Sequence, residues 1–214
     1  MKSYAVIGLG RFGTETALRL CALGEEVLAI DTDENRVNGI ADRVTKAVVA
    51  DATNKDVLKK LGVPDCDCVI ISIGSNLAAS VLTTMTVKSL NAAQIICKAH
   101  DDMHREILQK LGADQVIIPE QLVADKLAVS LSSGNIMDYI ELSDKYGISE
   151  CKVPSAWVGK TIHELHVRSE YGVSIIAIKN EDQISIAPSP EAELKKGQIL
   201  ILLGDYDSLN KIEK

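Results

Sequence analysis

A glycine-rich turn near the start of the chain, Gly8-Leu9-Gly10-Arg11-Phe12-Gly13, sets narrow limits on the fold. An apolar run at residues 4–7 leads into the turn, and a helical pattern at residues 12–23 follows it. In a strand–turn–helix unit of this kind, the first glycine permits the tight turn, the second lets a phosphate approach the backbone, and the third lets helix and strand pack closely. The turn therefore predicts a phosphate site at the start of a helix, although the glycines could serve only the tight turn.

The first ~120 residues continue the alternation of short aliphatic runs and helical patterns. Aromatic residues make up only 3% of the chain against 46% hydrophobic residues, so the core consists of Val, Ile, Leu and Ala, which suits a buried parallel sheet. Short connections imply right-handed crossovers and helices on both faces. We expect a Rossmann-like doubly wound α/β domain with strands at 4–7, 26–30, 47–50, 68–73, 95–98 and 115–118, and helices at 12–23, 34–42, 55–61, 77–90 and 103–111.

The pattern changes after Pro119. A helix is expected over residues 121–131, and Ser132-Ser133-Gly134-Asn135 is typical of a hinge. The remaining segments are shorter and predict a second, small α+β domain. The expected domains are therefore 1–135, which binds a nucleotide, and 136–214, with strands at 138–142, 150–153, 173–178, 184–186 and 198–203 and a helix at 162–168.

Asp31 ends the second expected strand, about 20 residues after the glycine turn, where a carboxylate accepts hydrogen bonds from both ribose hydroxyls. A 2′-phosphate would face Asp31 and Asp33 and be repelled, which favours an unphosphorylated adenosine ribose over that of NADP. The alternative is that Asp31 caps the following helix, a role that Thr32 or Asp33 could also fill.

Two further segments end strands at the same edge of the sheet. Asp51-Ala52-Thr53 should flank the adenine, and Ser72-Ile73-Gly74-Ser75-Asn76 should lie where ligands bind in such sheets. Gly74 allows a close approach of the backbone. Asn76 could contact the ligand or cap the helix expected at 77–90.

Three charged residues bear on chemistry. Arg11 occupies a position that the glycine motif leaves open, and its guanidinium suits bidentate phosphate contact, although it could be a solvated surface residue. Lys98 and Glu120 could form an acid–base pair, or bind a terminal phosphate and a cation. No Walker lysine follows the turn, and His163 and His166 have no third metal ligand at suitable spacing. Because we expect no separate substrate-binding domain in this chain, nucleotide binding is a better prediction than catalysis.

Composition excludes other classes of function. The net charge is −7, and no aromatic residues interleave with basic ones, which argues against a nucleic-acid partner. Five cysteines lack metal-site spacing, as expected for reduced thiols in the cytoplasm. No run approaches the roughly 20 apolar residues of a membrane span, and the chain enters its first strand without a signal peptide.

These motifs together resemble the RCK family, the regulatory gating subunits of the Ktr and Trk potassium-uptake systems. The glycine turn is common to Rossmann proteins, whereas the Arg11-Phe12 pair within it and the Pro119-Glu120 corner are more specific. The resemblance covers nearly the whole chain and rests on segments 6–13, 27–31, 50–53, 82–84, 98–99, 112–114, 118–120, 167–172 and 188–190.

The resemblance implies homodimers that assemble into an octameric ring under a membrane-embedded potassium transporter of the KtrB or TrkH type. The ligand would be ATP or ADP, or NAD(H) as in some relatives. Arg11 would reach a terminal phosphate on a neighbouring subunit, and Glu120 would help bind a cation there. Asp51 stands where close relatives often carry Asn, so nucleotide preference stays open. The implied site comprises Gly8, Gly10, Arg11, Phe12, Gly13, Asp31, Thr32, Asp33, Asp51, Ala52, Thr53, Ser72, Ile73, Gly74, Asn76, Lys98 and Glu120.

The C-terminal domain of many members binds cyclic di-AMP between two protomers. By resemblance, that second site would comprise Ile162, Leu165, Val167, Arg168, Tyr171, Ile175, Ile176, Ala187 and Pro188.

The predicted function is a cytoplasmic, non-catalytic nucleotide sensor that gates a potassium transporter at the inner face of the cell membrane. Two alternatives stay open: a small NAD-dependent oxidoreductase that uses Lys98 or Glu120, and a free-standing nucleotide sensor without a transporter partner.

Overall fold

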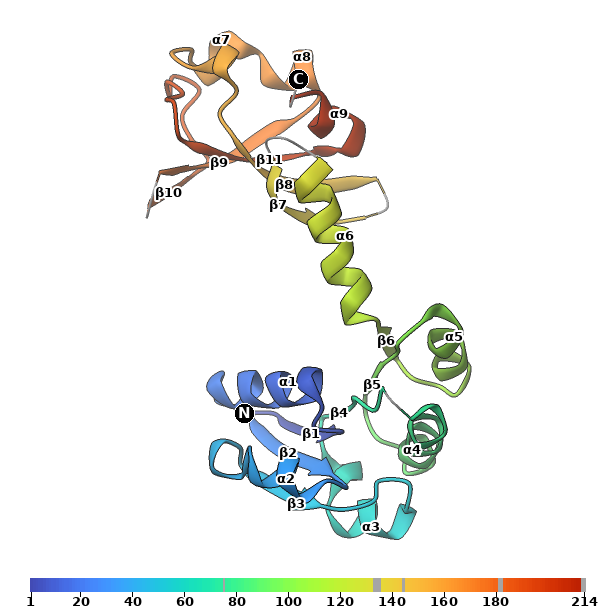
Figure 1. The fold of residues 1–214 in the computed structure, drawn as a ribbon. Helices are drawn as coiled ribbons and strands as arrows, with labels where there is room; N and C mark the ends of the chain where they lie inside the picture. The colour runs from blue at the N-terminus through green and yellow to red at the C-terminus, as the bar shows by residue number, and fades with distance from the viewer. Residues whose placement is uncertain (75, 133–135, 144, 181–182, 213–214) are drawn as a thin grey trace. The chain divides into compact units, whose positions relative to one another are not determined.

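The computed structural model describes residues 1–74, 76–132, 136–143, 145–180 and 183–212. This part of the chain divides into two compact units, Met1–Gln121 and Leu122–Lys214, each with its own sheet (Figure 1). The hinge predicted at residues 132–135 falls mainly on residues 133–135, which lie outside the described residues. The domain boundary predicted after residue 135 therefore stays a prediction.

The first unit contains a parallel sheet, six-stranded within the described residues. The strand order β3-β2-β1-β4-β5-β6 is that of a doubly wound nucleotide-binding fold, and the order reverses between β1 and β4. This confirms the predicted fold class. The strands are β1 (Ser3–Ile7), β2 (Glu26–Asp31), β3 (Lys46–Val49), β4 (Cys68–Ile71), β5 (Ile95–Lys98) and β6 (Gln115–Ile117).

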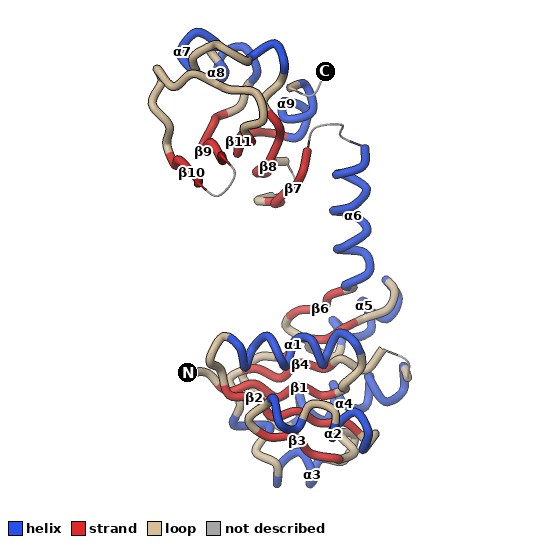
Figure 2. The backbone as a smooth tube through the Cα atoms, turned by 60° about the vertical axis from the view of Figure 1, so that its left-hand side comes forward, coloured by secondary structure: helices blue, strands red, loops and turns tan. Residues whose placement is uncertain are grey.

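Helices cover both faces of this sheet, as Figure 2 shows. The side chains of β1 alternate accordingly, because Ala5 and Ile7 enter one hydrophobic cluster and Val6 enters another. Strands buried on both faces explain the aliphatic runs in the sequence. The helices connecting these strands are α1 (Arg11–Ala22), α2 (Glu34–Asn38), α3 (Lys55–Lys60), α4 (Leu77–Ser89) and α5 (Asp102–Lys110), and α6 (Pro119–Ser132) follows β6.

Glycines end several of these helices. Gly24, Gly62 and Gly112, after α1, α3 and α5, all have a positive φ, the left-handed conformation in which glycine commonly ends a helix. The helix predicted at 34–42 is shorter than expected. It stops before Gly39, and a 3₁₀ turn at Ala41–Arg43 follows, since glycine disfavours continuation of the helix.

The second unit is a small α+β domain built on an antiparallel sheet of order β10-β9-β11-β8-β7. The helix predicted at 162–168 is divided at His166, whose φ of 45° is left-handed. Helix α9, which Asp205 caps, was not predicted from the sequence. The strands are β7 (Ile136–Glu141), β8 (Tyr146–Lys152), β9 (Ser174–Asn180), β10 (Gln183–Ile186) and β11 (Ile199–Asp205), and the helices are α7 (Ile162–Leu165), α8 (Val167–Tyr171) and α9 (Tyr206–Lys211).

Within the described ranges, no helix combines the length and the apolar character that crossing a membrane requires.

Candidate functional site

A cavity of about 1000 Å³ lies in the first unit, at the carboxyl ends of the parallel strands. This is the edge at which open α/β sheets bind ligands. The turns after all of the strands β1 to β6 contribute to it. Of the residues predicted for the nucleotide site, the structure brings together at this cavity Gly8, Gly10, Arg11, Phe12, Asp31, Thr32, Asp51, Ala52, Thr53, Ser72, Ile73, Gly74, Asn76, Lys98 and Glu120.

Two predicted residues, Gly13 and Asp33, are not among those that line the cavity. Gly13 packs helix against strand, and Asp33 caps α2 by accepting a hydrogen bond from the amide of Asn35. Several lining residues were not predicted. They are Ile7, Ile30, Arg36, Ala50, Ala79, Thr83, His100 and Pro119.

The three glycines of the turn have separate roles. Gly8 has a φ of +93°, which side chains other than glycine's rarely adopt. A Cβ at Gly13 would lie 2.0 Å from the carbonyl oxygen of Gly8, so the backbones touch there. A Cβ at Gly10 would meet nothing within 4 Å. Since Gly10 also lines the cavity and caps α1 without a side-chain hydrogen bond, a phosphate can approach the amide groups at this helix end.

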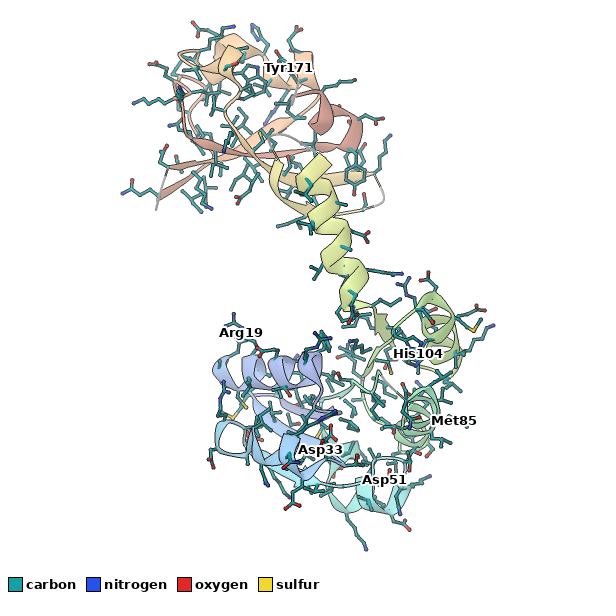
Figure 3. The ribbon with its side chains drawn as sticks, in the orientation of Figure 1. Arg19, Asp33, Asp51, Met85, His104 and Tyr171 are labelled. Atoms are coloured by element: carbon teal, nitrogen blue, oxygen red, sulfur yellow. The ribbon has the colours of Figure 1, made fainter. Side chains whose placement is uncertain are left out.

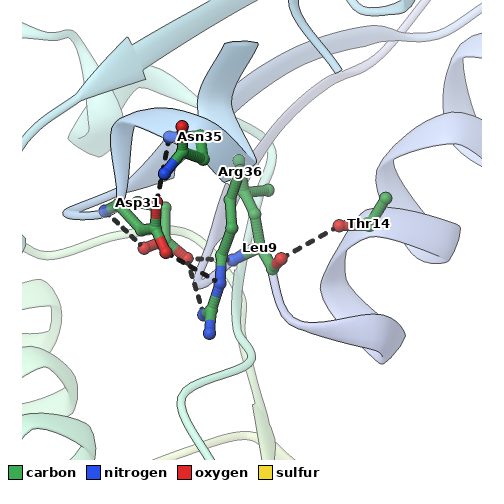
Figure 4. A network of polar contacts seen from close by, with 6 residues as sticks. Leu9, Thr14, Asp31, Asn35 and Arg36 are labelled. Carbon is green, nitrogen blue, oxygen red and sulfur yellow. Dashed lines mark hydrogen bonds and ion pairs between the residues drawn. The ribbon is translucent and has the colours of Figure 1, made fainter. Parts of the chain in front are cut away.

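Asp31 accepts hydrogen bonds from two backbone amides, one in the glycine turn and one just after β2 (Figure 4). Its Oδ2 accepts from the Leu9 amide at 2.6 Å, and its Oδ1 accepts from the Asp33 amide at 2.9 Å. Arg36 Nη1 lies 3.6 Å from Oδ2, and Arg36 Nε lies 3.5 Å from Asp33 Oδ2. These contacts fix a buried carboxylate that retains lone pairs for a ribose. They also place a cation beside it.

Hydrogen bonds to a carboxylate also fix the turn after β3. Asp51 Oδ1 accepts from the amide of Thr53 at 2.9 Å and from its hydroxyl at 2.7 Å. These two hydrogen bonds, the amide first, lower the pKa of Asp51 below its usual range. Asn76 caps α4, because its Oδ1 accepts from the amide of Ala79 at 3.0 Å. Asn76 also lines the cavity, so the predicted contact and the capping role are compatible.

Lys98 and Glu120 form an ion pair, with Lys98 Nζ 2.9 Å from Glu120 Oε1. This hydrogen bond is the main cause that lowers the pKa of Glu120, and the Arg11 guanidinium acts in the same direction. Lys98 Nζ also lies 6.0 Å from the centroid of the Phe12 ring. Two cations, Arg11 and Lys98, and one carboxylate, Glu120, therefore line the cavity. A terminal phosphate fits this balance of charge.

A polar chain of His100, His104 and Ser80 joins the cavity to α4. His100 lines the cavity, and its Nδ1 lies 2.8 Å from Nδ1 of His104. His104 Nε2 lies 3.1 Å from the hydroxyl of the buried Ser80. Burial, and then the neighbouring His100, lowers the pKa of His104. Figure 3 shows His104 on α5 and Asp51 after β3.

No group of three or more His, Cys, Asp or Glu side chains suited to a metal ion occurs in the part of the chain that the structure describes. A cation at Glu120 would need further ligands, such as phosphate oxygens.

The residues predicted for the second ligand site lie around α7, α8 and the β9–β10 region of the second unit. Leu165 and Val167 are core residues, against which Ile162, Tyr171 and Ile175 pack. The Tyr171 hydroxyl lies 3.4 Å from Trp157 Nε1, and the amide of Ala187 donates to the Ile176 carbonyl at 2.9 Å. Ala187 has a φ of 49°, which is uncommon for a residue other than glycine.

Two solved structures of similar fold contain the GsuK RCK domain. A crystal structure of the GsuK RCK domain superposes with a TM-score of 0.68 at 23% identity, over 99% of this chain. A structure of the GsuK channel bound to NAD gives 0.68 at 23% identity over 97%. The chain spans 47% and 38% of the length of those two proteins. At this identity, the likeness establishes the fold.

Comparison of sequences gives the family. Residues 4–119 match the model of the TrkA-N domain, and residues 148–214 match that of the TrkA-C domain. Ktr system potassium uptake protein A of Bacillus subtilis (strain 168) is 41% identical over 99% of this chain and 96% of its own length. Protein C of the same system and organism is 39% identical over 100% of this chain and 96% of its own. The chain therefore belongs to the RCK family of TrkA-N and TrkA-C domain proteins, together with the Ktr system potassium uptake proteins A and C.

Proposed function

We propose that this protein is the nucleotide-sensing subunit of a potassium uptake system, and that the cavity of the first unit is its sensor site. The observation that carries this is the full-length similarity to Ktr system potassium uptake proteins, in a chain whose cavity is lined by a glycine turn and a ribose-type carboxylate. The proposed ligand is ATP or ADP, with NAD(H) as the alternative. The proposed location is the inner face of the cell membrane, as a cytoplasmic protein held by its transporter.

The charges of Arg11, Lys98 and Glu120 at the cavity support a role in distinguishing a third phosphate from a second. None of the ion pairs among the described residues involves Arg11, which is exposed and lines the cavity. We propose that Arg11 contacts the terminal phosphate bound to a neighbouring subunit, within homodimers that assemble into an octameric ring. Glu120 would then hold a cation beside that phosphate.

Gating follows from this proposal by linkage. A ligand moves a ring between two shapes only by the difference in its affinity for them. A phosphate contact made across a subunit boundary supplies such a difference, because it forms in only one packing of the ring. Coupling of about 1–3 kcal/mol, typical of allostery, corresponds to a shift of roughly 5- to 150-fold.

The test is calorimetric titration of the full chain with ATP, ADP, NADH and NADPH, on the wild type and on Arg11→Ala. We expect binding without turnover, exclusion of NADPH by Asp31, and loss of the difference between ATP and ADP in the variant. A variant that distinguishes ATP from ADP as the wild type does would refute the phosphate role of Arg11. Arg19→Ala on the same helix is the matched control, since Arg19 does not line the cavity.

The two alternatives have their own readouts. Steady oxidation of NADH with a small carbonyl substrate, abolished by Lys98→Ala, would favour an oxidoreductase. Failure to co-purify with a membrane-embedded potassium transporter of the KtrB or TrkH type would favour a free-standing sensor.

We also propose cyclic di-AMP as a ligand of the second unit, around Arg168, Tyr171 and the Ala187-Pro188 corner. The left-handed Ala187 supports this, because strained backbone outside glycine is concentrated at ligand sites. Titration of wild type and Arg168→Ala with cyclic di-AMP tests it, and an unchanged affinity would remove Arg168 from the site.

A further inference from the structure

One wall of the cavity carries a polar group that the protein itself leaves unpaired. Ala79 and Thr83, one turn apart on α4, both line the cavity. Thr83 is 0% exposed, and its hydroxyl has no hydrogen-bond partner among the residues that the structure describes. Buried hydroxyls without a partner are rare, and one on a residue that lines a cavity points to a ligand as the missing partner.

The neighbouring threonines on α4 are satisfied differently. Thr84 Oγ1 donates to the carbonyl of Ser80 at 2.8 Å, in the usual pattern of threonine within a helix. Thr86 Oγ1 donates to the carbonyl of Thr53 at 3.3 Å. Partnering within the protein is therefore normal along this helix, and the unpaired hydroxyl is peculiar to Thr83, the one of these three that lines the cavity.

The contact between Thr86 and Thr53 shows which end of a ligand Thr83 would meet. It packs α4 against the turn after β3, and Thr83 lies less than one helical turn from Thr86. Along the sheet, the glycine turn follows β1, Asp31 ends β2 and Thr53 follows β3. A nucleotide with its phosphates at the glycine turn and its ribose at Asp31 has its base at Thr53, and so beside Thr83.

We propose that Thr83 binds the nucleobase, and that its hydroxyl donates a hydrogen bond to a ring nitrogen of adenine. The inference rests on the proposed function, since it requires a nucleotide in this cavity. A hydroxyl has one hydrogen to donate, and the ring nitrogens N1, N3 and N7 of adenine accept. A base without an acceptor at that place leaves the buried hydroxyl unpaired, which gives Thr83 a role in specificity as well as affinity.

The test combines protein variants with ligand variants. Wild type, Thr83→Val, Thr83→Ser and Thr84→Val are titrated calorimetrically with ADP and with its 1-deaza, 3-deaza and 7-deaza analogues. Each analogue replaces one ring nitrogen by a C–H group. Thr83→Val keeps the side-chain shape, Thr83→Ser keeps the hydroxyl, and Thr84→Val is the matched control outside the cavity.

We expect Thr83→Val to weaken ADP binding roughly 5- to 10-fold, the loss typical of one hydrogen bond, while Thr83→Ser and Thr84→Val bind within about twofold of wild type. One deaza analogue should bind wild type more weakly by a similar factor, and lose nothing further in Thr83→Val. This non-additivity is the signature of a direct contact. The ligand-free Thr83→Val protein should melt no lower than wild type, because the hydroxyl that it removes has no partner.

Two outcomes would overturn the role of Thr83 and leave the proposed function intact. One is ADP binding by Thr83→Val that equals that of wild type. The other is wild-type affinity for all three deaza analogues equal to that for ADP, a result that does not depend on any variant. Failure of wild type to bind any adenine nucleotide would instead refute the proposed function, and the role of Thr83 with it.

Discussion

Gly10 and Gly13 lie three residues apart in one turn, yet alanine at each position should have opposite consequences. At Gly10 the backbone has φ −69° and ψ −175°, which alanine adopts without strain. Restricting the unfolded chain would stabilise the protein by about 0.4–1 kcal/mol, and the weaker helix cap would offset this by a similar amount. Gly10→Ala should therefore melt within about 3 °C of wild type.

Binding should nevertheless be lost in Gly10→Ala. The new methyl group would stand in open space at the cavity, where the phosphate of the proposed ligand would approach the amide groups of α1. For wild type at a ligand concentration of 100 times Kd, binding stabilises by about 2.7 kcal/mol. That corresponds to a melting shift of roughly 5–10 °C for a chain of this length. In Gly10→Ala this shift should fall to near zero.

Gly13→Ala should instead affect mainly the melting temperature of the protein without ligand. Its Cβ would lie 2.0 Å from a backbone oxygen, so the turn or the helix must move. Overpacking of this kind costs about 1–3 kcal/mol or more, which lowers the melting temperature by at least several degrees without ligand. The assay is thermal denaturation of both variants with and without ADP. Equal ADP-induced shifts in Gly10→Ala and wild type would refute the phosphate-approach argument.

Three further predictions concern buried ionisable groups. Asp31→Asn should lower the free energy of unfolding by about 1–3 kcal/mol in urea denaturation, because the Leu9 amide loses its carboxylate acceptor, and should raise the relative affinity for NADPH. Burial lowers the pKa of His104 below its ordinary value of about 6.5, so the unfolded chain binds a proton more readily than the folded one. The melting temperature should therefore decrease as the pH is lowered below about 6.5, and His104→Asn should weaken this dependence of the melting temperature on pH. Burial raises the pKa of Cys97 to about 11, so a thiol reagent at pH 8 should label the partly exposed Cys21 in the native protein, and Cys97 only after unfolding.

The sequence predicted the sheet and most of the cavity because both depend on local patterns. Parallel strands buried on both faces must read as aliphatic runs, and each run ends at the edge where ligands bind. Asp31 could be singled out as a candidate ribose ligand from its distance along the chain to the glycine turn. The turn residues at Asp51 and Ser72 followed by the same reasoning, since each closes a strand.

Residues that reach the cavity from the side of a helix could not be predicted in this way. Arg36 lies in a surface-like segment of α2, and only the structure shows its guanidinium beside Asp31. Thr83, Thr84 and Thr86 are three threonines close together on one helix, and the sequence does not distinguish them. In the structure, Thr83 lines the cavity, Thr84 is in the core and bonds within the helix, and Thr86 bonds to the turn after β3. The difference depends on how α4 is rotated about its axis. Tertiary packing determines this rotation, and the helix propensity of the residues does not.

The state of Glu120 bears on the choice between sensing and catalysis. A general base that works near neutral pH needs a carboxyl pKa raised toward 6–7, usually by burial in an apolar pocket. Here the hydrogen bond from Lys98 and the charge of Arg11 lower the pKa of Glu120, and its side chain is 65% exposed. An ionised, solvated carboxylate that is paired with a lysine is a poor proton acceptor. Under the proposed function, a terminal phosphate would compete for Lys98 and leave the Glu120 carboxylate able to bind a cation. The ion pair that disfavours acid–base chemistry at Glu120 would thus allow the proposed change of pairing when a nucleotide binds.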